Sequence, residues 1–416
     1  MIAERVSEPP SLIVFSDDWG RHPSSCQHLI KKLLPNYRVL WVNTIGTRAP
    51  RLDLTTIKRV GEKLKQWTQK KNSTSEESEA TVAHDNLKVV NPRMWPWFSR
   101  SHDRRLNSYL LSRQLAPLIK DLPQPVTAIT TLPITADLAQ LLAVEQWIYY
   151  CVDDFGEWPG LDGNTLREMD VQMIQRADRI VAVSEHLQSM ISSHGRSSTL
   201  LTHGVDLECW QHTATPKDIQ NILPNNCDRP LAVFWGVVDR RLNSDMIAAL
   251  SKRMQHGNIL LVGPQQDPDE RILNLHNVHA PGPLPFSSLP TLAQAASVLI
   301  MPYADLPVTQ AMQPLKMKEY MVTGQPVVVS NLPAVREWND CLDIVDNAAD
   351  FAEMVTQRLS SGIPDVQLQA RTRLRLESWS SKAKQLEHSL LATCPRQLTE
   401  AMGNRDHRQV DLVHKN

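Results

Sequence analysis

The sequence predicts an α/β protein built from two consecutive doubly wound parallel sheets. Short runs rich in Val, Ile and Leu recur along its 416 residues, with amphipathic stretches between them. Such alternation is typical of a parallel sheet with helices on both faces. The series is interrupted near residues 210–227 and then starts again, so we expect two Rossmann-like domains of similar size.

Seven strands and one helix are expected in the first half. The helix spans Ser25–Leu34, after a polar loop that follows the first strand. The strands are Ser11–Phe15, Val39–Val42, Leu87–Val90, Thr127–Thr131, Trp147–Cys151, Arg179–Val183 and the short Leu200–Thr202. Residues from about 61 to 84 are polar and rich in Ser and Glu, which predicts a mobile insertion.

The second half repeats the pattern. Its expected strands are Leu231–Trp235, Ile259–Val262, Val278–Ala280, Val298–Met301 and Val327–Ser330, and its expected helices are Ser244–Met254, Phe286–Ala296 and Met312–Thr323. Helical periodicity continues over Asp365–Leu391. We therefore expect a first domain over 1–209 and a second over 210–370. A helical segment over 371–394 is expected to pack back on the first domain, followed by a disordered tail over 395–416.

Composition excludes several classes of protein. Lys and Arg number 44 against 45 Asp and Glu, so no global field favours nucleic acid or an anionic membrane as a partner. The loop after the first strand is not G-x-G-x-x-G and no P-loop motif occurs, which disfavours a dehydrogenase or a P-loop kinase. The six cysteines are scattered without metal-ligand spacing, so we expect reduced thiols, no metal site and a cytoplasmic location.

Candidate site residues of the first half follow its strands. The loop after the first strand contains Gly20, Arg21 and His22, which could line a cleft or form a solvated connection with an N-capping serine. Asp153 follows the strand that ends at Cys151, and the adjacent Asp154 could serve a site or cap the next helix. His22 and Asp153 are the catalytic candidates, because both follow strands at the edge where a substrate would bind. Gly204 is expected to permit a turn with positive φ.

The second half carries stronger signals. Gly236 ends a strand and Arg241 follows closely, an arrangement suited to an anion such as a diphosphate. Lys316 lies in the expected first turn of a helix, where a cation is unfavourable unless an anion offsets it. Glu319 lies three residues on, near the same face. A Lys for phosphate and a Glu for ribose hydroxyls would grip a nucleoside diphosphate, although a plain Lys–Glu surface pair has the same spacing.

Five segments together resemble bacterial GT-B glycosyltransferases of group 1, of the retaining family-four type, in the branch similar to teichuronic-acid-type transferases. They are PLKMKEYMVTGQPVVVS, LLVGP, FWGVVDRRLN, YYCVDDFGEWPG and HGVD. The resemblance implies two Rossmann-like domains facing a cleft, with the acceptor on the first and a nucleotide-sugar donor on the second. It implies that Arg241 and Lys316 contact the donor diphosphate and that Glu319 contacts the ribose. It also implies that Gly236, which has no side chain, lets the backbone approach the donor. The expected reaction is hexosyl transfer to a saccharide or lipid-linked acceptor in cell-surface polysaccharide synthesis, without metal or cofactor.

One position departs from the family pattern. The family has two glutamates eight positions apart, and the position eight before Glu319 is Ala311. This departure leaves open a degenerate module that binds glycan or nucleotide without catalysis. A nucleotide-sugar 2-epimerase, which uses the same fold, is a separate alternative. Single glycines at Gly20, Gly204, Gly263 and Gly324 are expected to form turns that border the cleft.

A final segment mixes aromatic and basic side chains. Residues 91–100 read NPRMWPWFSR and are followed by Arg104 and Arg105. Trp and Arg suit a lipid headgroup interface, so peripheral contact with the inner membrane face is one interpretation. An acceptor-site loop or plain packing of the tryptophans is the alternative.

Overall fold

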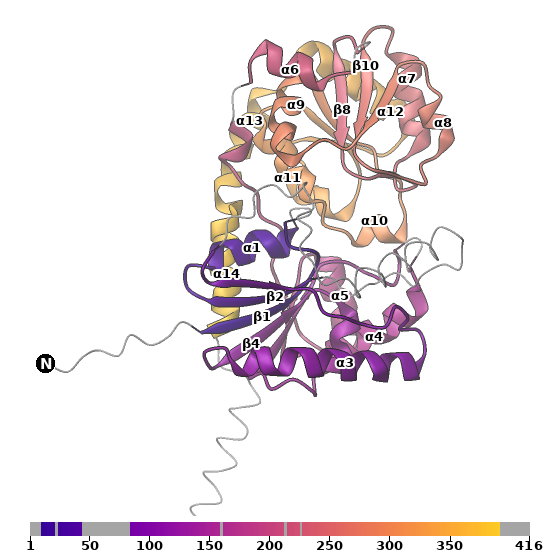
Figure 1. Cartoon of the computed structure of the whole chain (residues 1–416). Coiled ribbons are helices and arrows are strands. Elements are labelled where there is room, and N and C mark those ends of the chain that lie inside the picture. Colours follow the sequence, from indigo (N-terminus) through magenta and orange to yellow (C-terminus); the bar gives the residue numbers. More distant parts are fainter. Residues whose placement is uncertain are drawn as a thin grey trace, which may run out of the picture. The chain divides into compact units, whose positions relative to one another are not determined.

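The computed structural model describes residues 10–20, 24–43, 84–158, 161–211, 214–224 and 227–391 (Figure 1). The chain divides into two compact units, Met1–Leu201 with Ala383–Asn416 and Thr202–Lys382. The expected tail over 395–416, nearly all of the expected insertion, and both Arg21 and His22 lie outside the described residues.

A seven-stranded parallel sheet with strand order β3-β2-β1-β4-β5-β6-β7 forms the first unit. β1 pairs in register with β2 on one side and β4 on the other, and all of its side chains are buried. Strands that are apolar throughout are what a sheet covered on both faces requires. The strands are β1 (Ser11–Phe15), β2 (Arg38–Val42), β3 (Leu87–Val90), β4 (Val126–Thr130), β5 (Gln146–Cys151), β6 (Arg179–Ala182) and β7 (Thr199–Leu200).

Polar side chains cap several helices of this unit. Ser24, Asp162 and Ser184 accept backbone N–H bonds as the N-caps of α1, α4 and α5. Asp154 is therefore not the cap of the next helix, because its carboxylate accepts instead from Gly156 N within its own turn. The helices are α1 (Ser25–Leu33), α3 (Ser101–Lys120), η1 (Pro133–Leu138), α4 (Gly163–Arg176), α5 (Glu185–Ser193) and, with its last turns, α14 (Trp379–Leu391).

A six-stranded parallel sheet with strand order β12-β10-β8-β13-β14-β15 forms the second unit, beside a small β9–β11 pair. The strands are β8 (Leu231–Trp235), β9 (Val238–Asp239), β10 (Asn258–Val262), β11 (Gln265–Gln266), β12 (Val278–Gly282), β13 (Val298–Met301), β14 (Val327–Ser330) and β15 (Asp343–Val345). The helices are η2 (Cys209–Gln211), α6 (Pro216–Ile222), α7 (Ser244–Arg253), α8 (Glu270–Leu273), η3 (Phe286–Ser288), α9 (Leu289–Ala295), α10 (Pro307–Ala311), α11 (Leu315–Val322), η4 (Pro333–Trp338), α12 (Ala348–Ser361), α13 (Asp365–Ala370) and η5 (Arg371–Glu377).

The predicted α/β class with two doubly wound units is confirmed, while some expected helices are shorter. The helix expected from Met312 begins at Leu315, because Pro314 is its N-cap. The helical stretch expected over 365–391 is broken at Ser378, whose ψ of 149° is extended. Ser378 pairs there with Val205 as an isolated bridge, and Trp379 N donates to Val205 O. A tertiary backbone contact thus overrides the local helical pattern.

Candidate functional site

The topological switch point of the second sheet lies between β8 and β13. From β8 the chain adds β10 and β12 on one side, and β13, β14 and β15 on the other. In open parallel sheets ligands bind beyond the carboxyl ends of the strands at such a point. The segments that leave β8 and β13 therefore define the candidate site.

Lys316 is the cation at this point. Its ammonium donates to the Tyr303 hydroxyl at 2.6 Å and lies 4.7 Å from the centre of the Phe234 ring. Within the described ranges of the chain, no carboxylate forms an ion pair with Lys316. The ammonium lies on the first turn of α11, and the hydroxyl and the ring face that hold it are neutral. Its positive charge therefore favours binding of an anion.

Two glycines give the backbone clearance that this arrangement needs. Gly236 has φ +142°, and a Cβ there would overlap the Lys316 ammonium. Gly263 has φ +148°, and a Cβ there would overlap the carbonyl of Gly236. The predicted strand-exit glycines 236 and 263 thus pack against one another directly beside Lys316.

The backbone of Arg241 lies at the same edge of the sheet. Its carbonyl accepts from Ala304 N at 2.8 Å, and Leu242 forms a bridge with Tyr303, whose hydroxyl contacts Lys316. Its guanidinium is buried and bonds the carboxylate of Asp239 at 2.8–3.0 Å. The structure therefore brings Arg241 close to Lys316 in the fold, with its charge already compensated by Asp239.

Glu319 extends the site along α11. Its carboxylate accepts from the Trp235 indole N–H at 3.2 Å, and Trp210 stacks on Trp235 with ring centres 5.4 Å apart. Burial raises the pKa of Glu319 to about 7, against the smaller opposing effects of the indole and of Lys316. The carboxylate is a hydrogen-bond acceptor whose charge changes near neutral pH.

Aromatic groups of this site were not predicted from the sequence. Phe234, Trp235, Tyr303 and Tyr320 surround the Lys and Glu side chains, and the Tyr320 hydroxyl accepts from Trp235 N at 3.0 Å. The strand-exit positions of Trp235 and Tyr303 were the signal available. Their roles depend on contacts with α11 that the chain order does not reveal.

A second lysine of α11, Lys318, has a structural environment. It is buried and donates to the carbonyl of His203 at 2.6 Å and to the carboxylate of Glu377, which also accepts from Lys382 at 2.8 Å. Burial lowers the pKa of Lys318, and the two lysines together hold the pKa of Glu377 below its usual value although burial opposes this. This ion cluster fixes one side of α11, while Lys316 remains at the switch point.

The equivalent point of the first unit lies between β1 and β4 and is acidic. Asp17 accepts from Ser24 at 2.7 Å and from Ser16 at 2.9 Å, and Gln27 bonds its other oxygen. Gln27 in turn accepts from Gly20 N at 2.9 Å, where Gly20 has φ +79° as its predicted turn requires. Burial raises the pKa of Asp17 against these donors.

Asp153 lies just beyond β5, half-buried, with its carbonyl 4.0 Å from Cys151 Sγ. Nearby, the Tyr149 hydroxyl donates to the buried carboxylate of Asp170, whose pKa burial raises to about 6. His22, the other catalytic candidate, lies outside the described residues. No described group of three or more His, Cys, Asp or Glu side chains could hold a metal ion.

The remaining glycines differ in their roles. Gly324 has φ +79° after the end of α11, as expected for a turn. The prediction of a positive φ at Gly204 is wrong, since Gly204 is not among the positive-φ residues. A Cβ at Gly204 would lie 2.7 Å from the Trp379 ring, so close packing accounts for this glycine.

Known proteins resemble this chain in sequence. Residues 231–361 match the family model described as Glycosyl transferases group 1. Over 213 residues the chain is 29% identical to a curated protein of Bacillus subtilis (strain 168) named "Putative teichuronic acid biosynthesis glycosyltransferase TuaH". That match covers 47% of this chain and 53% of the relative, so it spans about half of the relative's length.

Solved structures resemble the chain over most of its length. HepE of Anabaena in complex with UDP-glucose has a TM-score of 0.62 at 13% identity, covering 91% of this chain and 99% of that one. Sucrose-phosphate synthase from Thermosynechococcus elongatus has a TM-score of 0.65 at 17% identity, covering 94% of this chain and 100% of that one.

Two parallel doubly wound units with a basic switch point in the second define a protein of the GT-B fold. The matched domain adds the family: residues 231–361 match the glycosyl transferases group 1 domain, and the chain as a whole has the fold of GT-B glycosyltransferases. The resemblance stated from its motifs is thereby confirmed.

Proposed function

We propose that the protein transfers a sugar from a nucleoside diphosphate sugar to a hydroxyl of a saccharide or lipid-linked acceptor. The observation that carries the proposal is the Lys316 ammonium, which is held at the switch point by Tyr303 and Phe234 without an ion-pair partner in the described part of the chain. The complexes of HepE with UDP and UDP-glucose support this donor class.

The chemistry follows from charge. The bond between the anomeric carbon and the diphosphate oxygen breaks, and the diphosphate leaves with the electron pair. The acceptor oxygen forms the new glycosidic bond, and its proton passes to an oxygen of the leaving diphosphate. Lys316 and the first turn of α11 stabilise the charge that develops on the leaving diphosphate. Glu319, ionised above pH 7, accepts hydrogen bonds from the ribose hydroxyls, as the family resemblance implies.

The finer assignments belong to the same proposal. Arg241 would contact the diphosphate after its guanidinium leaves Asp239 in part, and His22 and Asp153 would orient the acceptor or the donor sugar. We propose retention of anomeric configuration and a role in cell-surface polysaccharide synthesis. The name of the Bacillus relative supports that pathway.

Nucleotide binding tests the proposal. Calorimetry with UDP and UDP-glucose, beside the corresponding guanosine, adenosine and thymidine compounds, should find one tightly bound donor. Lys316→Ala should weaken that donor roughly 30-fold, because a charge-assisted hydrogen bond contributes about 2 kcal/mol. Lys252→Ala, which removes an exposed lysine of the same unit, is the matched control.

Product analysis separates the rival activities. Incubation of the protein with the bound donor alone should leave its sugar unchanged, whereas an epimerase would convert it. NMR of the product formed with an acceptor gives the anomeric configuration. Equal donor affinity of Lys316→Ala and Lys252→Ala would refute the assigned diphosphate site.

A further inference from the structure

The first unit carries a basic strip that the donor site does not use. Between Asp85 and Asp121 the exposed charged groups are all cationic, and the one carboxylate, that of Asp103, is buried. The exposed cations are Lys88, Arg93, Arg100, Arg105, Arg113 and Lys120. In a chain whose net charge is −1, this is a strong local asymmetry.

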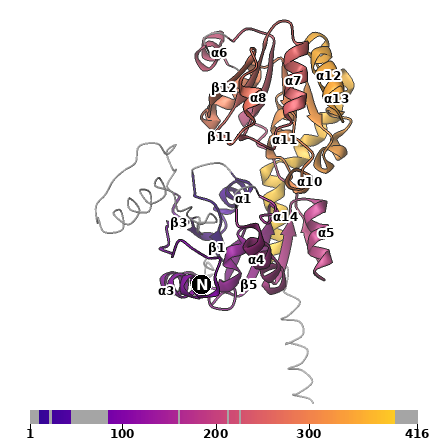
Figure 2. The ribbon, with the colours of Figure 1, turned by 90° about the vertical axis from the view of Figure 1, so that its right-hand side faces the viewer.

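Apolar side chains are exposed in the same strip. Large hydrophobic side chains there are exposed by 37% at Val89, 40% at Trp95, 42% at Leu106 and 56% at Tyr109. Val89 belongs to β3, the edge strand of the sheet, and Figure 2 shows β3 and α3 on the same side of the unit. Aromatic, aliphatic and basic groups thus share one surface.

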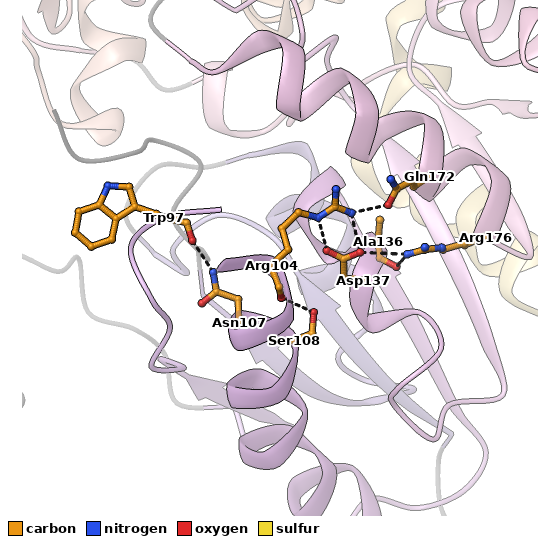
Figure 3. A network of polar contacts seen from close by, with 8 residues as sticks. All are labelled: Trp97, Arg104, Asn107, Ser108, Ala136, Asp137, Gln172 and Arg176. Atoms are coloured by element: carbon orange, nitrogen blue, oxygen red, sulfur yellow. Dashed lines mark hydrogen bonds and ion pairs between the residues drawn. The ribbon is translucent and has the colours of Figure 1, made fainter. Parts of the chain in front are cut away.

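Hydrogen bonds hold the aromatic segment along α3. The Trp95 indole N–H donates to Asp103 at 3.0 Å, and Trp95 N donates to Asn107 at 2.7 Å. Asn107 also donates to the carbonyl of Trp97 at 2.8 Å (Figure 3). Leu106 and Tyr109 are three residues apart on α3, so these two exposed side chains are neighbours on its outer face.

The inner side of α3 is fixed by a polar network (Figure 3). Arg104 bonds both oxygens of Asp137 at 2.7 Å and Gln172 at 2.6 Å, and Arg176 donates to Asp137 as well. Burial alone would raise the pKa of Asp137, but Arg104 and Arg176 lower it overall. Arg104 therefore holds the inner side of α3 to the rest of the unit, whereas Arg105 is exposed on the outer side.

We infer that this strip, β3 with residues 91–100 and the outer face of α3, is a docking surface for a bilayer that contains anionic phospholipids. The cations match the negative surface potential of such a bilayer. Trp and Tyr rings are favoured at the level of the headgroups, and arginine stems cover apolar surface while their charges reach phosphate. A nucleic acid would use the cations but has no need of exposed Leu106 and Val89. None of the helices in the described ranges has the length and hydropathy of a transmembrane span.

Vesicle co-sedimentation of the full chain tests the inference independently of transferase activity. The protein should pellet with phosphatidylcholine vesicles that contain phosphatidylglycerol, and not with phosphatidylcholine alone. Binding should fall as salt is raised, since exposed charges are screened. Arg105→Ala/Arg113→Ala should weaken binding by roughly 30-fold, because each basic residue near the surface contributes about 1 kcal/mol.

Two further variants sharpen the result. Lys252→Ala/Arg253→Ala removes the same charge from exposed positions of α7 in the second unit and should bind like wild type. Trp95→Ala should weaken binding at high salt, where the apolar contribution remains. Wild type that fails to pellet with anionic vesicles, or equal losses in both double variants, overturns the inference. So does binding to a DNA duplex that is tighter than vesicle binding and depends on Arg105 and Arg113.

Discussion

The two units have the same architecture but opposite chemistry at their switch points. In the second, Lys316 lies between a tyrosine hydroxyl and a phenylalanine ring. In the first, Asp17 is surrounded by neutral donors, Ser16, Ser24 and Gln27. A cation held by neutral groups favours an anionic ligand, whereas a carboxylate already saturated by hydroxyl and amide donors organises its own loop.

The two switch points also differ in how their loops are packed. In the second unit Gly236 and Gly263 adopt φ values near +145° and pack backbone to backbone. In the first unit the loop after β1 is ordered by side chains that bond Asp17 and Gln27. The comparison teaches that the proposed donor site depends on the absence of side chains at Gly236 and Gly263, whereas the loop of the first unit depends on its polar side chains.

The largest expected effect is on the glycine contact. Gly263→Ala places a Cβ on the Gly236 carbonyl and should reduce the free energy of unfolding by about 4 kcal/mol, with loss of donor binding. Gly324→Ala shares a positive φ but has open space around the new Cβ, so it should cost only about 1 kcal/mol. Chemical denaturation measures both. Equal costs would show that strain of φ, and not contact between the two glycines, explains Gly263.

Sequence patterns predicted the strands well because parallel strands buried on both faces are continuous apolar runs. They also placed Lys316 and Glu319 on one helix, since residues three apart share a face. Ends of helices were less predictable: Pro314 serves as a cap, and Ser378 is held extended by Val205.

Partners distant in sequence could not be predicted. Glu319 bonds the indole of Trp235, 84 residues away, and Gly204 is small because Trp379 packs on it. Arg241 was expected to be available to a diphosphate, but the turn after β9 brings Asp239 against its guanidinium. Local spacing gives the residue types of a site, while tertiary contacts decide which charges are compensated.

An intermediate effect is expected from Asp17→Asn in the first unit. The amide keeps one oxygen acceptor where the carboxylate has two, so one of the donors Ser24 and Gln27 loses its partner. Unfolding free energy should fall by about 1–2 kcal/mol, while donor affinity stays at the wild-type value. Asp121→Asn, at an exposed position of the same unit, is the control and should change neither quantity. A loss of donor affinity as large as that of Lys316→Ala would break the division of roles between the units.

The smallest effect is the pH dependence of Glu319. Its pKa is raised from 4.5 to about 7 in the folded protein, so ionisation opposes folding and its cost develops as pH rises from 4.5 to 7. Glu319→Gln keeps an acceptor for Trp235 without the charge. The full pKa shift would correspond to about 3 kcal/mol, but the side chain is only half-buried, so we expect the variant to be more stable by about 1 kcal/mol at pH 8 and unchanged at pH 4. Donor binding should respond oppositely, because the ionised carboxylate accepts the ribose hydroxyls: wild-type affinity should decline below pH 7, and the variant should be weaker and independent of pH. Thermal unfolding and calorimetry at both pH values measure the two trends. A variant that is less stable than wild type at pH 8 would mean that the ionised Glu319 is stabilised by the fold, and would remove the link between its burial and donor binding.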